Sequence, residues 1–411
     1  MNDENTAVIY IEHAKVREVY FNGLTLPTNK DITVSWSDAM KLSRLGYFTT
    51  YIKSVQTVSQ DYNPALFKEQ KMYGFTADAD TESGFGNCTT NLLRQSIKDG
   101  YDIRWVGRAN NVSDLTHLMS KQIPPNIGMV WHEQPNGRWD QSPFGVNIAI
   151  TPFETTRVPA SWVPRLNSFN ALFVPCKQNI DMMRDSGVTI PIELIHWGID
   201  PKITKPQPRE ADGLFTFGTY GALSKRKGTD MLVRAFQRAF PIYEYRDVRL
   251  ICKTSKPHFY FKPSPPDSRV IVDLMRTDQE QMDQFYRKID VGVFPFTGEG
   301  FGMCPLETAG VGRPIIITGW SGPMDYFKDE IGWKLNYQLI PAEDFNTKVY
   351  HEDCGSWAQA DENELVHLMR YAYEHRDEVK AKGQAAQEYV QREWTWDAQI
   401  PLYFDALKKH L

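Results

Sequence analysis

The sequence has few cysteines, and their arrangement excludes the usual cysteine-based structures. Its five cysteines are odd in number and widely spaced: Cys88, Cys176, Cys252, Cys304 and Cys354. They fit neither a disulfide framework nor a zinc site, so we expect reduced thiols and a cytoplasmic location. No apolar run approaches the ~20 residues that span a bilayer, and the N-terminus lacks the basic and apolar regions of a secretory signal. The sequence therefore predicts no transmembrane segment.

An excess of positive charge is also absent. The formal net charge of −5 argues against a protein that coats nucleic acid through bulk electrostatics. With 41% hydrophobic and 24% charged residues, the composition is that of a globular protein. A chain of 411 residues is long enough for two ordinary domains and a small additional piece.

Residues 1–62 form the predicted small piece, an α+β accessory module. Short β-branched and aromatic runs indicate strands, and Ser37 offers an N-cap for a helix that Gly46 can end. Acidic and basic residues balance in this stretch, so we do not expect it to be a basic arm that binds nucleic acid. Recognition of an acceptor and formation of a homo-oligomer both remain open as its role. The polar stretch 58–70 is expected to be a linker.

From Lys71 onward, strands alternate with helices, which indicates βαβ units and parallel sheets. Two such series are expected, separated by a proline-rich linker at 198–213. The predicted fold class is α/β, with two Rossmann-like domains. The predicted boundaries are 67–203 for the N-terminal domain, 212–392 for the C-terminal domain, and 393–411 for a C-terminal helix.

The most informative segment is DVGVFPFTGEGFGMCPLETAGVGRPIIITGWSGPMDYF, residues 290–327. An apolar strand leads into a glycine-bearing turn, and Pro305 suits the first turn of the helix that follows. Free amides at such a helix start favour oxyanions and sugar hydroxyls. Glu299 precedes the turn and Glu307 lies inside the helix, so both can face one cleft. Two carboxylates beside bare amides suit a polyhydroxylated ligand.

This segment resembles the Glu-x7-Glu signature of the large retaining glycosyltransferase family with the GT-B fold, glycosyl transferases group 1. Three further segments resemble the family in the same order: residues 151–200, GLFTFGTYGALSKRKGTDMLVRAFQRAF at 213–240, and EWTWDAQIPLYFDAL at 393–407. The resemblance covers about residues 68–411. It leaves the first ~60 residues unexplained. The resemblance implies the GT-B fold, in which the two Rossmann-like domains face a cleft and the helix at 393–411 returns to the N-terminal domain.

Carried over residue by residue, the resemblance implies a site made by both domains. Glu307 would bind the ribose diol of the nucleotide, and Glu299 would hold hydroxyls of the transferred sugar. Lys227 would neutralise the diphosphate, assisted by Arg226 or Lys225. The family usually has an arginine about five residues before that lysine, where this sequence has Ala222. The other implied contacts are Gly84 and Gly86 in the first strand–helix loop, His132 at a strand end, and the backbone of Phe301, Gly302, Met303 and Cys304.

The resemblance implies retaining transfer of a hexose or other sugar from a nucleotide diphosphate donor. Paired cations and helix-terminal amides can stabilise the leaving diphosphate without a metal, so no metal or other cofactor is expected. The sequence singles out no carboxylate as a nucleophile and no general base. The acceptor stays open among glycan, lipid, protein and modified nucleic acid, and the base of the nucleotide is also open.

Other interpretations stand beside this one. The chain could be a disaccharide synthase, an epimerase-like hydrolase, or a non-catalytic relative that only binds a nucleotide sugar. His132 could be a structural residue at a strand end, and the basic run at 225–227 a solvated loop. Asp78-Ala79-Asp80 has the form of the Asp-x-Asp metal motif, but its place after the first strand favours a loop and helix cap.

Overall fold

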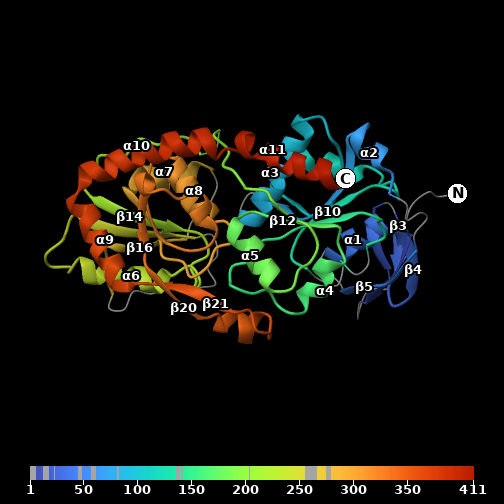
Figure 1. Cartoon of the computed structure of the whole chain (residues 1–411), viewed down its shortest axis with the longest axis horizontal. Helices are drawn as coiled ribbons and strands as arrows, with labels where there is room; N and C mark the ends of the chain where they lie inside the picture. The colour runs from blue at the N-terminus through green and yellow to red at the C-terminus, as the bar shows by residue number, and fades with distance from the viewer. Residues whose placement is uncertain are drawn as a thin grey trace.

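The computed structural model describes residues 6–12, 18–22, 24–44, 49–56, 62–80, 83–135, 139, 142–202, 204–254, 266–274 and 279–411. Two six-stranded parallel sheets and one small antiparallel sheet carry the fold. The three parts follow one another along the long axis of the molecule, with the small sheet beside the N-terminal α/β domain (Figure 1). The predicted pair of Rossmann-like domains with a small N-terminal module is confirmed.

The N-terminal module is a three-stranded antiparallel sheet with one helix. The sheet has the order β4-β1-β5, and β1 alternates buried with more accessible residues, which is typical of a half-buried strand. The side chain of Ser35, not Ser37, accepts the backbone hydrogen bond of Asp38 at the start of the helix. Gly46 lies outside the described residues. The elements are β1 (Thr6–Glu12), β2 (Glu18–Phe21), β3 (Leu24–Pro27), β4 (Asp31–Ser35), α1 (Trp36–Arg44) and β5 (Thr49–Gln56).

Helix α1 joins the module to the N-terminal domain because it has two apolar faces. Trp36 and Met40 belong to the core of the N-terminal domain, whereas Ala39 and Leu42 belong to the core of the module. The ring of Trp36 meets that of Trp131 edge-on at 5.8 Å. Helix α1 is therefore part of two hydrophobic cores, and the module packs tightly against the N-terminal domain.

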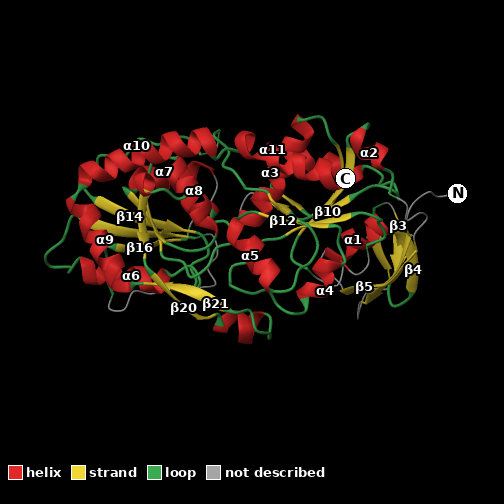
Figure 2. Cartoon of the chain, viewed as in Figure 1, coloured by secondary structure: helices red, strands yellow, loops and turns green. Residues whose placement is uncertain are grey.

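The N-terminal domain is built on a parallel sheet of order β13-β12-β11-β10-β6-β8, with helices on both faces (Figure 2). Its central strands β10 and β11 are buried along their whole length, as expected for a sheet covered on both sides. The stretch predicted as a linker, 58–70, contains helix α2, which Asn63 caps. The elements are α2 (Pro64–Lys68), β6 (Met72–Thr76), β7 (Ala79–Asp80), α3 (Gly84–Lys98), β8 (Asp102–Val106), β9 (Ala109–Asn110), η1 (Ser113–Ser120), β10 (Met129–His132), β11 (Asn147–Ile150), α4 (Trp162–Asn167), β12 (Ala171–Val174), α5 (Lys177–Asp185) and β13 (Ile192–Leu194).

The C-terminal domain repeats this plan with a parallel sheet of order β16-β15-β14-β17-β18-β19. Every residue of β14, β17 and β18 is buried. The elements are β14 (Phe215–Tyr220), α6 (Thr229–Ala239), β15 (Val248–Lys253), β16 (Val270–Asp273), α7 (Gln279–Lys288), β17 (Val291–Phe294), α8 (Met303–Gly310), β18 (Ile315–Thr318), η3 (Gly322–Asp325), η4 (Asp329–Ile331), β19 (Gly332–Leu335), β20 (Tyr337–Pro341), η5 (Phe345–Val349), β21 (Ser356–Ala360), α9 (Glu362–Glu374) and α10 (Arg376–Glu393).

The chain crosses between the two domains twice, and the crossings lie side by side. Ile199 of the proline-rich segment forms a parallel bridge with Thr395, which caps α11 (Trp396–His410). Helix α11 then packs on the N-terminal domain, where Phe404 stacks on Tyr101 at 4.7 Å. The residue limits predicted for the four parts of the chain stay a prediction.

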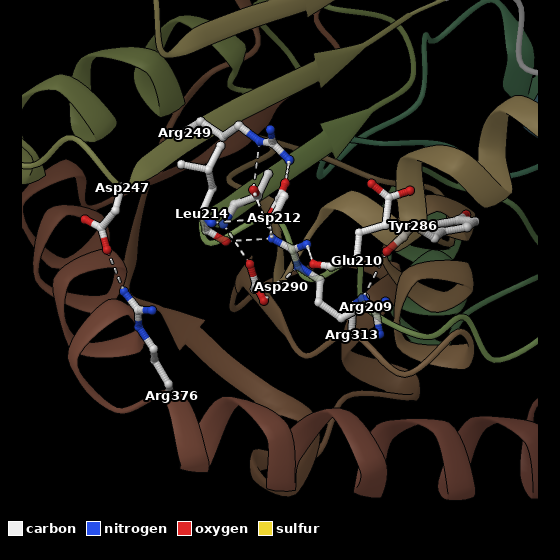
Figure 3. A network of polar contacts seen from close by, with 11 residues as sticks. Arg209, Glu210, Asp212, Leu214, Asp247, Arg249, Tyr286, Asp290, Arg313 and Arg376 are labelled. Carbon is white, nitrogen blue, oxygen red and sulfur yellow. Dashed lines mark hydrogen bonds and ion pairs between the residues drawn. The ribbon is translucent and has the colours of Figure 1, made fainter.

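A network of ion pairs anchors the segment that enters the C-terminal domain (Figure 3). Arg209 binds Asp290 at 3.0 Å and Asp212 at 3.1 Å, and Arg249 binds Asp212 at 2.6 Å. Asp290 in turn accepts the backbone amide of Thr216 at 2.7 Å. The network thus fixes the start of β14, whose far end reaches the candidate site.

The hairpin of β20 and β21 reaches from the C-terminal domain to the N-terminal one. Glu352 accepts the backbone amide of Ser161 at 2.9 Å, and the ring of Tyr350 meets that of Trp162 edge-on at 5.6 Å. Among the described residues, no helix combines the length and apolar character needed to cross a membrane. All five cysteines are free.

Candidate active site

A cavity of about 1240 Å³ lies between the two α/β domains. Its walls are the carboxyl ends of parallel strands and the starts of the helices that follow, which is where open α/β sheets bind ligands. From the N-terminal domain it is lined by Asp78, Asp80, Ser83, Gly84, Phe85, Gly86, Asn87, Arg94, His132, Glu133, Gln134, Pro135, Pro152, Glu154 and Trp197. From the C-terminal domain and the linker it is lined by Thr204, Tyr220, Gly221, Ala222, Arg226, Lys227, Gln279, Met282, Tyr286, Glu299, Gly300, Phe301, Gly302, Met303, Cys304 and Glu307.

The glycine-bearing turn after β17 presents Glu299 and the start of α8 to this cavity. Gly302 caps α8 with φ of 89°, a left-handed conformation that favours glycine. The backbone carbonyl of Glu299 accepts hydrogen bonds from the hydroxyl of Ser321 and from the amide of Gly322. Ser321 itself has φ of 67° and ψ of −158°, which is costly for a residue with a side chain. The strained backbone at Ser321 therefore fixes the position of the turn through these two hydrogen bonds.

Four charged side chains meet at the end of this turn, two cations and two carboxylates. Lys227 forms an ion pair with the carboxylate of Glu299. Arg226 lies 3.9 Å from Glu299 and 3.6 Å from Glu154 of the N-terminal domain, and donates to the carbonyl of Gly298 at 2.7 Å. Burial alone would lower the pKa of Arg226, but the two carboxylates raise it above the usual value. We call Arg226 and Lys227 the cationic corner; its ion pairs join the two domains, and its two basic side chains suit a diphosphate.

Glu307 lies on α8 at the inner wall, and a chain of hydroxyl groups leads to it. Tyr286 donates to Tyr220 at 2.9 Å, and Tyr220 donates to Oε2 of Glu307 at 2.5 Å. Burial raises the pKa of Glu307 to about 7, against the effect of the Tyr220 hydrogen bond. The backbone carbonyl of Tyr286 accepts a hydrogen bond from buried Arg313 at 3.1 Å, a contact that Figure 3 also shows. One oxygen of Glu307 is thus engaged by the protein, and the side chain lines the cavity.

His132 ends β10 on the opposite wall. Its ring is completely buried, stacks on Phe85 at 4.0 Å, and shares a hydrogen bond of 2.9 Å between Nδ1 and Thr89. Its Nε2 has no hydrogen-bond partner among the described residues. Burial lowers the pKa of His132 to about 3, so the ring is neutral at physiological pH. A neutral imidazole with one unused nitrogen can exchange a hydrogen bond with a bound hydroxyl.

The first strand–helix loop of the N-terminal domain supplies the start of α3. Ser83 caps the helix by accepting the amide of Gly86 at 2.9 Å, and Asp80 accepts the amide of Ser83 at 2.6 Å. A Cβ atom at Gly86 would lie 2.1 Å from the Asp80 carboxylate, whereas one at Gly84 would meet open space. Gly86 is therefore required by packing, and Gly84 leaves the helix start open to the cavity. The helix-capping role predicted for Asp78-Ala79-Asp80 is indirect, because Ser83 is the N-cap and Asp80 holds Ser83 in place. Ala79–Asp80 form the short strand β7 where a loop was predicted.

The structure brings together eleven of the twelve predicted site residues at one cavity; the exception is Lys225. Lys225 is exposed and lies outside the lining, and its charge acts on Asp344. Ala222, at the position where an arginine was expected, lines the cavity without a charge. Arg226 and Lys227 are thus the cations that the described part of the C-terminal domain contributes to the lining. The roles of these residues stay predictions.

Sequence reasoning missed two parts of the site. The hydroxyl chain through Tyr220 and Tyr286 was not predicted, although Tyr220 ends a predicted strand and could have been placed at the cleft. Glu133 was also missed, although it follows His132 directly at the end of β10. A buried carboxylate such as Glu133 leaves no periodic pattern in the sequence. The residues that pair with it could therefore not be predicted from their spacing.

Comparison with known proteins supports the interpretation of the C-terminal domain. Residues 215–350 match the family model described as glycosyl transferases group 1, which confirms the predicted resemblance. The lipopolysaccharide core biosynthesis mannosyltransferase LpsB of Rhizobium meliloti (strain 1021) is 28% identical over 144 residues, or 31% of this chain and 41% of the relative. The chain thus spans less than half the length of this curated relative.

Two solved structures share the two-domain fold. The sucrose-phosphate synthase of Thermosynechococcus elongatus matches with a TM-score of 0.59 and 15% identity, over 82% of this chain and 98% of that one. Anabaena HepE in complex with UDP-glucose matches with a TM-score of 0.60 and 12% identity, over 82% and 99%. These likenesses confirm the predicted GT-B fold over 82% of the chain.

Proposed function

We propose that this chain, whose C-terminal domain belongs to the glycosyl transferases group 1, moves a sugar from a nucleotide diphosphate donor to an acceptor. The transfer retains the anomeric configuration and needs no metal. The observation that carries the proposal is the convergence of Glu299, Glu307, Lys227 and the start of α8 on one interdomain cavity. Such a set matches the three chemical parts of a nucleotide sugar: ribose diol, diphosphate and sugar hydroxyls.

Glu307 is the proposed partner of the ribose. Tyr220 occupies Oε2 of this carboxylate, so the diol donates to the remaining acceptor positions. A hydrogen bond to the ionised form favours that form, which offsets the burial of the group. The nucleotide then lies against α8, with its diphosphate directed to the cationic corner at Arg226 and Lys227.

The donor must replace the ion pair between Lys227 and Glu299. The diphosphate takes the ammonium group, and hydroxyls of the sugar take the carboxylate, so neither charge is left buried without a partner. As the bond to the sugar breaks, negative charge grows on the departing diphosphate. Lys227, Arg226 and the free amides of Met303 and Cys304 at the start of α8 stabilise that charge.

The acceptor approaches from the N-terminal domain, whose wall carries His132, Glu133 and the start of α3. The proposal assigns His132 Nε2 to a hydroxyl of the transferred sugar or of the acceptor. HepE was solved with UDP-glucose, so UDP-glucose is the first donor to test.

The test measures nucleotide release from UDP-glucose, UDP-galactose and GDP-mannose, with and without EDTA. Release that EDTA does not change supports the proposal, and NMR of the product anomeric proton decides retention. The matched control is Glu307→Gln, which preserves size and removes the charge. Calorimetric donor binding without release, across a panel of acceptors, would instead indicate a non-catalytic relative. Absence of both binding and release would contradict the proposal.

A further inference from the structure

The N-terminal module extends one buried arginine to the wall of the cavity. Arg44, the last residue of α1, is 5% exposed. Its guanidinium donates to Asp78 at 3.0 Å, to Glu133 at 3.0 Å, and to the hydroxyl of Thr76 at 2.8 Å. Asp78 and Glu133 both line the cavity.

These three partners stand at the carboxyl ends of neighbouring strands. Thr76 ends β6, Asp78 follows it, and Glu133 follows His132 at the end of β10. Strands β6 and β10 pair in parallel, so the planar guanidinium bridges two adjacent strand ends at the ligand-binding edge of the sheet.

Helix α1 is built to deliver this side chain. Trp36, Met40 and Arg44 follow one another at intervals of four residues, so they lie on one helix face. Trp36 and Met40 are buried in the core of the N-terminal domain and fix the helix on that surface. Lys41 adds a hydrogen bond to the carbonyl of Met119 at 2.9 Å.

We propose that Arg44 is a positioning residue of the acceptor half of the site, through which the N-terminal module holds Glu133 and the adjacent His132 in place. This inference rests on the proposed function. On this inference the N-terminal module supports the active site directly. It does not act as a separate binding domain.

Charge gives the reason for this arrangement. The side chain of Glu133 is 12% exposed, and a carboxylate so far from water needs a paired cation. Asp78 has a second cation, because Arg108 binds it at 2.7 Å. Burial would raise the pKa of Asp78, but Arg108 and Arg44 hold it below the usual value. Arg44 therefore pairs with two carboxylates at the cavity wall, and through Glu133 it holds the end of β10.

The test is a double-substitution cycle on UDP release from UDP-glucose. Arg44→Lys keeps the charge and fold but loses the fork that bridges two strand ends. We expect it to lower release at saturating UDP-glucose by about tenfold. Its effect should disappear in the Glu133→Gln background, because the two residues act as one unit. The dissociation constant for UDP-glucose should stay within about twofold, since the nucleotide and diphosphate of the donor are assigned to the other domain.

Lys53→Met is the matched control, because Lys53 is an exposed cation of the same module that pairs with Asp31. It should leave release unchanged. Equal effects of Arg44→Lys with and without Glu133→Gln would indicate a general structural role and overturn the proposal, as would no effect at all.

A second readout separates this proposal from the function itself. If the wild-type chain releases no nucleotide, the proposed function fails. The ring NMR signals of His132 then decide the role of Arg44. They should shift with Arg44→Lys and stay in place with Lys53→Met. Unshifted signals in both variants would overturn the inference.

Discussion

Lys227 and Glu299 form an ion pair at the wall of the interdomain cavity. The two side chains are assigned to different parts of the same donor, the diphosphate and the sugar. Each neutralises the other, and Arg226 lies 3.9 Å from the same carboxylate. On the proposed assignment, a donor that binds exchanges this ion pair for contacts to its diphosphate and to its sugar, so the two ends of the substrate are bound together.

Lys227→Ala should lower turnover more than donor affinity. The charge that Lys227 stabilises is greatest as the diphosphate departs, so the substitution removes an interaction that is strongest in the transition state. We expect nucleotide release to fall by about 10² or more, and the dissociation constant for UDP-glucose to rise by less than tenfold. Release assays at saturating donor and calorimetry measure the two effects. Equal losses in both would assign Lys227 to ground-state binding only.

Glu299→Gln should distinguish the sugar from the nucleotide. Glu299 is assigned to sugar hydroxyls, so its replacement should weaken binding of UDP-glucose by about tenfold, a loss of about 1.4 kcal/mol. Binding of UDP should change little or become tighter, because Lys227 is then released from its pair. Calorimetry with both ligands gives the comparison. Equal weakening of UDP and UDP-glucose would remove Glu299 from the sugar subsite.

Much of this site could be predicted because its residues follow strands and start helices. The strand before Glu299, the glycine-bearing turn and the helix with Glu307 are continuous in sequence, so their order alone places both carboxylates near one edge. His132 ends a predicted strand and lies at the same cavity. The expectation that Lys225 assists was not supported by its position, because the turn before α6 directs that side chain to solvent.

The parts that could not be predicted depend on contacts between distant segments. Strands β20 and β21 were missed because β20 is only five residues long and ends at Pro341, a residue that argues against a strand. Arg44 belongs to a helix that was predicted, but its partners at 78 and 133 are far away in sequence. The hydroxyl chain from Tyr286 to Glu307 likewise joins β14, α7 and α8, which only the folded sheet brings together.

His132 should make the fold less stable in acid. Burial lowers the pKa of His132 to about 3, below the 6.5 of an ordinary histidine. The unfolded chain therefore binds the proton first, and the stability that the neutral ring contributes is lost as the pH falls from about 6.5 toward 3. The difference in unfolding free energy between wild type and His132→Gln, measured by urea at pH 7 and pH 5, should shrink in acid. A constant difference would mean that the ring is not kept neutral by burial.

Glu307 should have the opposite effect on stability. Its pKa is about 7 in the folded chain and 4.5 in an ordinary side chain, so the folded state holds the proton more tightly. The contribution is complete below pH 4.5 and is lost as the pH rises to about 7, which amounts to about 2–3 kcal/mol. Glu307→Gln stays neutral and should lack this slope. Urea unfolding of both proteins at pH 5 and pH 8 provides the measurement, and parallel slopes would contradict the raised pKa.

Donor binding should depend on pH through the same carboxylate. On the proposed assignment the ribose diol donates to Glu307, so the ionised form binds the donor, and affinity should rise as the pH increases through about 7. UDP-glucose is the ligand to use, because the terminal phosphate of UDP itself titrates near pH 6. Calorimetry between pH 5.5 and 8.5 should give a sigmoidal increase for the wild type and a flat, weak profile for Glu307→Gln.

Tyr220→Phe should move this profile to higher pH. Tyr220 donates to Glu307 at 2.5 Å and so favours the ionised carboxylate, and its removal raises the pKa further. At pH 7 the variant should bind UDP-glucose several-fold more weakly, and at pH 8.5 the two proteins should converge. Tyr286→Phe, one step further along the chain, should give a smaller shift in the same direction. A profile that stays at the wild-type position in Tyr220→Phe, with affinity reduced equally at every pH, would show that Tyr220 contacts the donor directly instead of tuning Glu307.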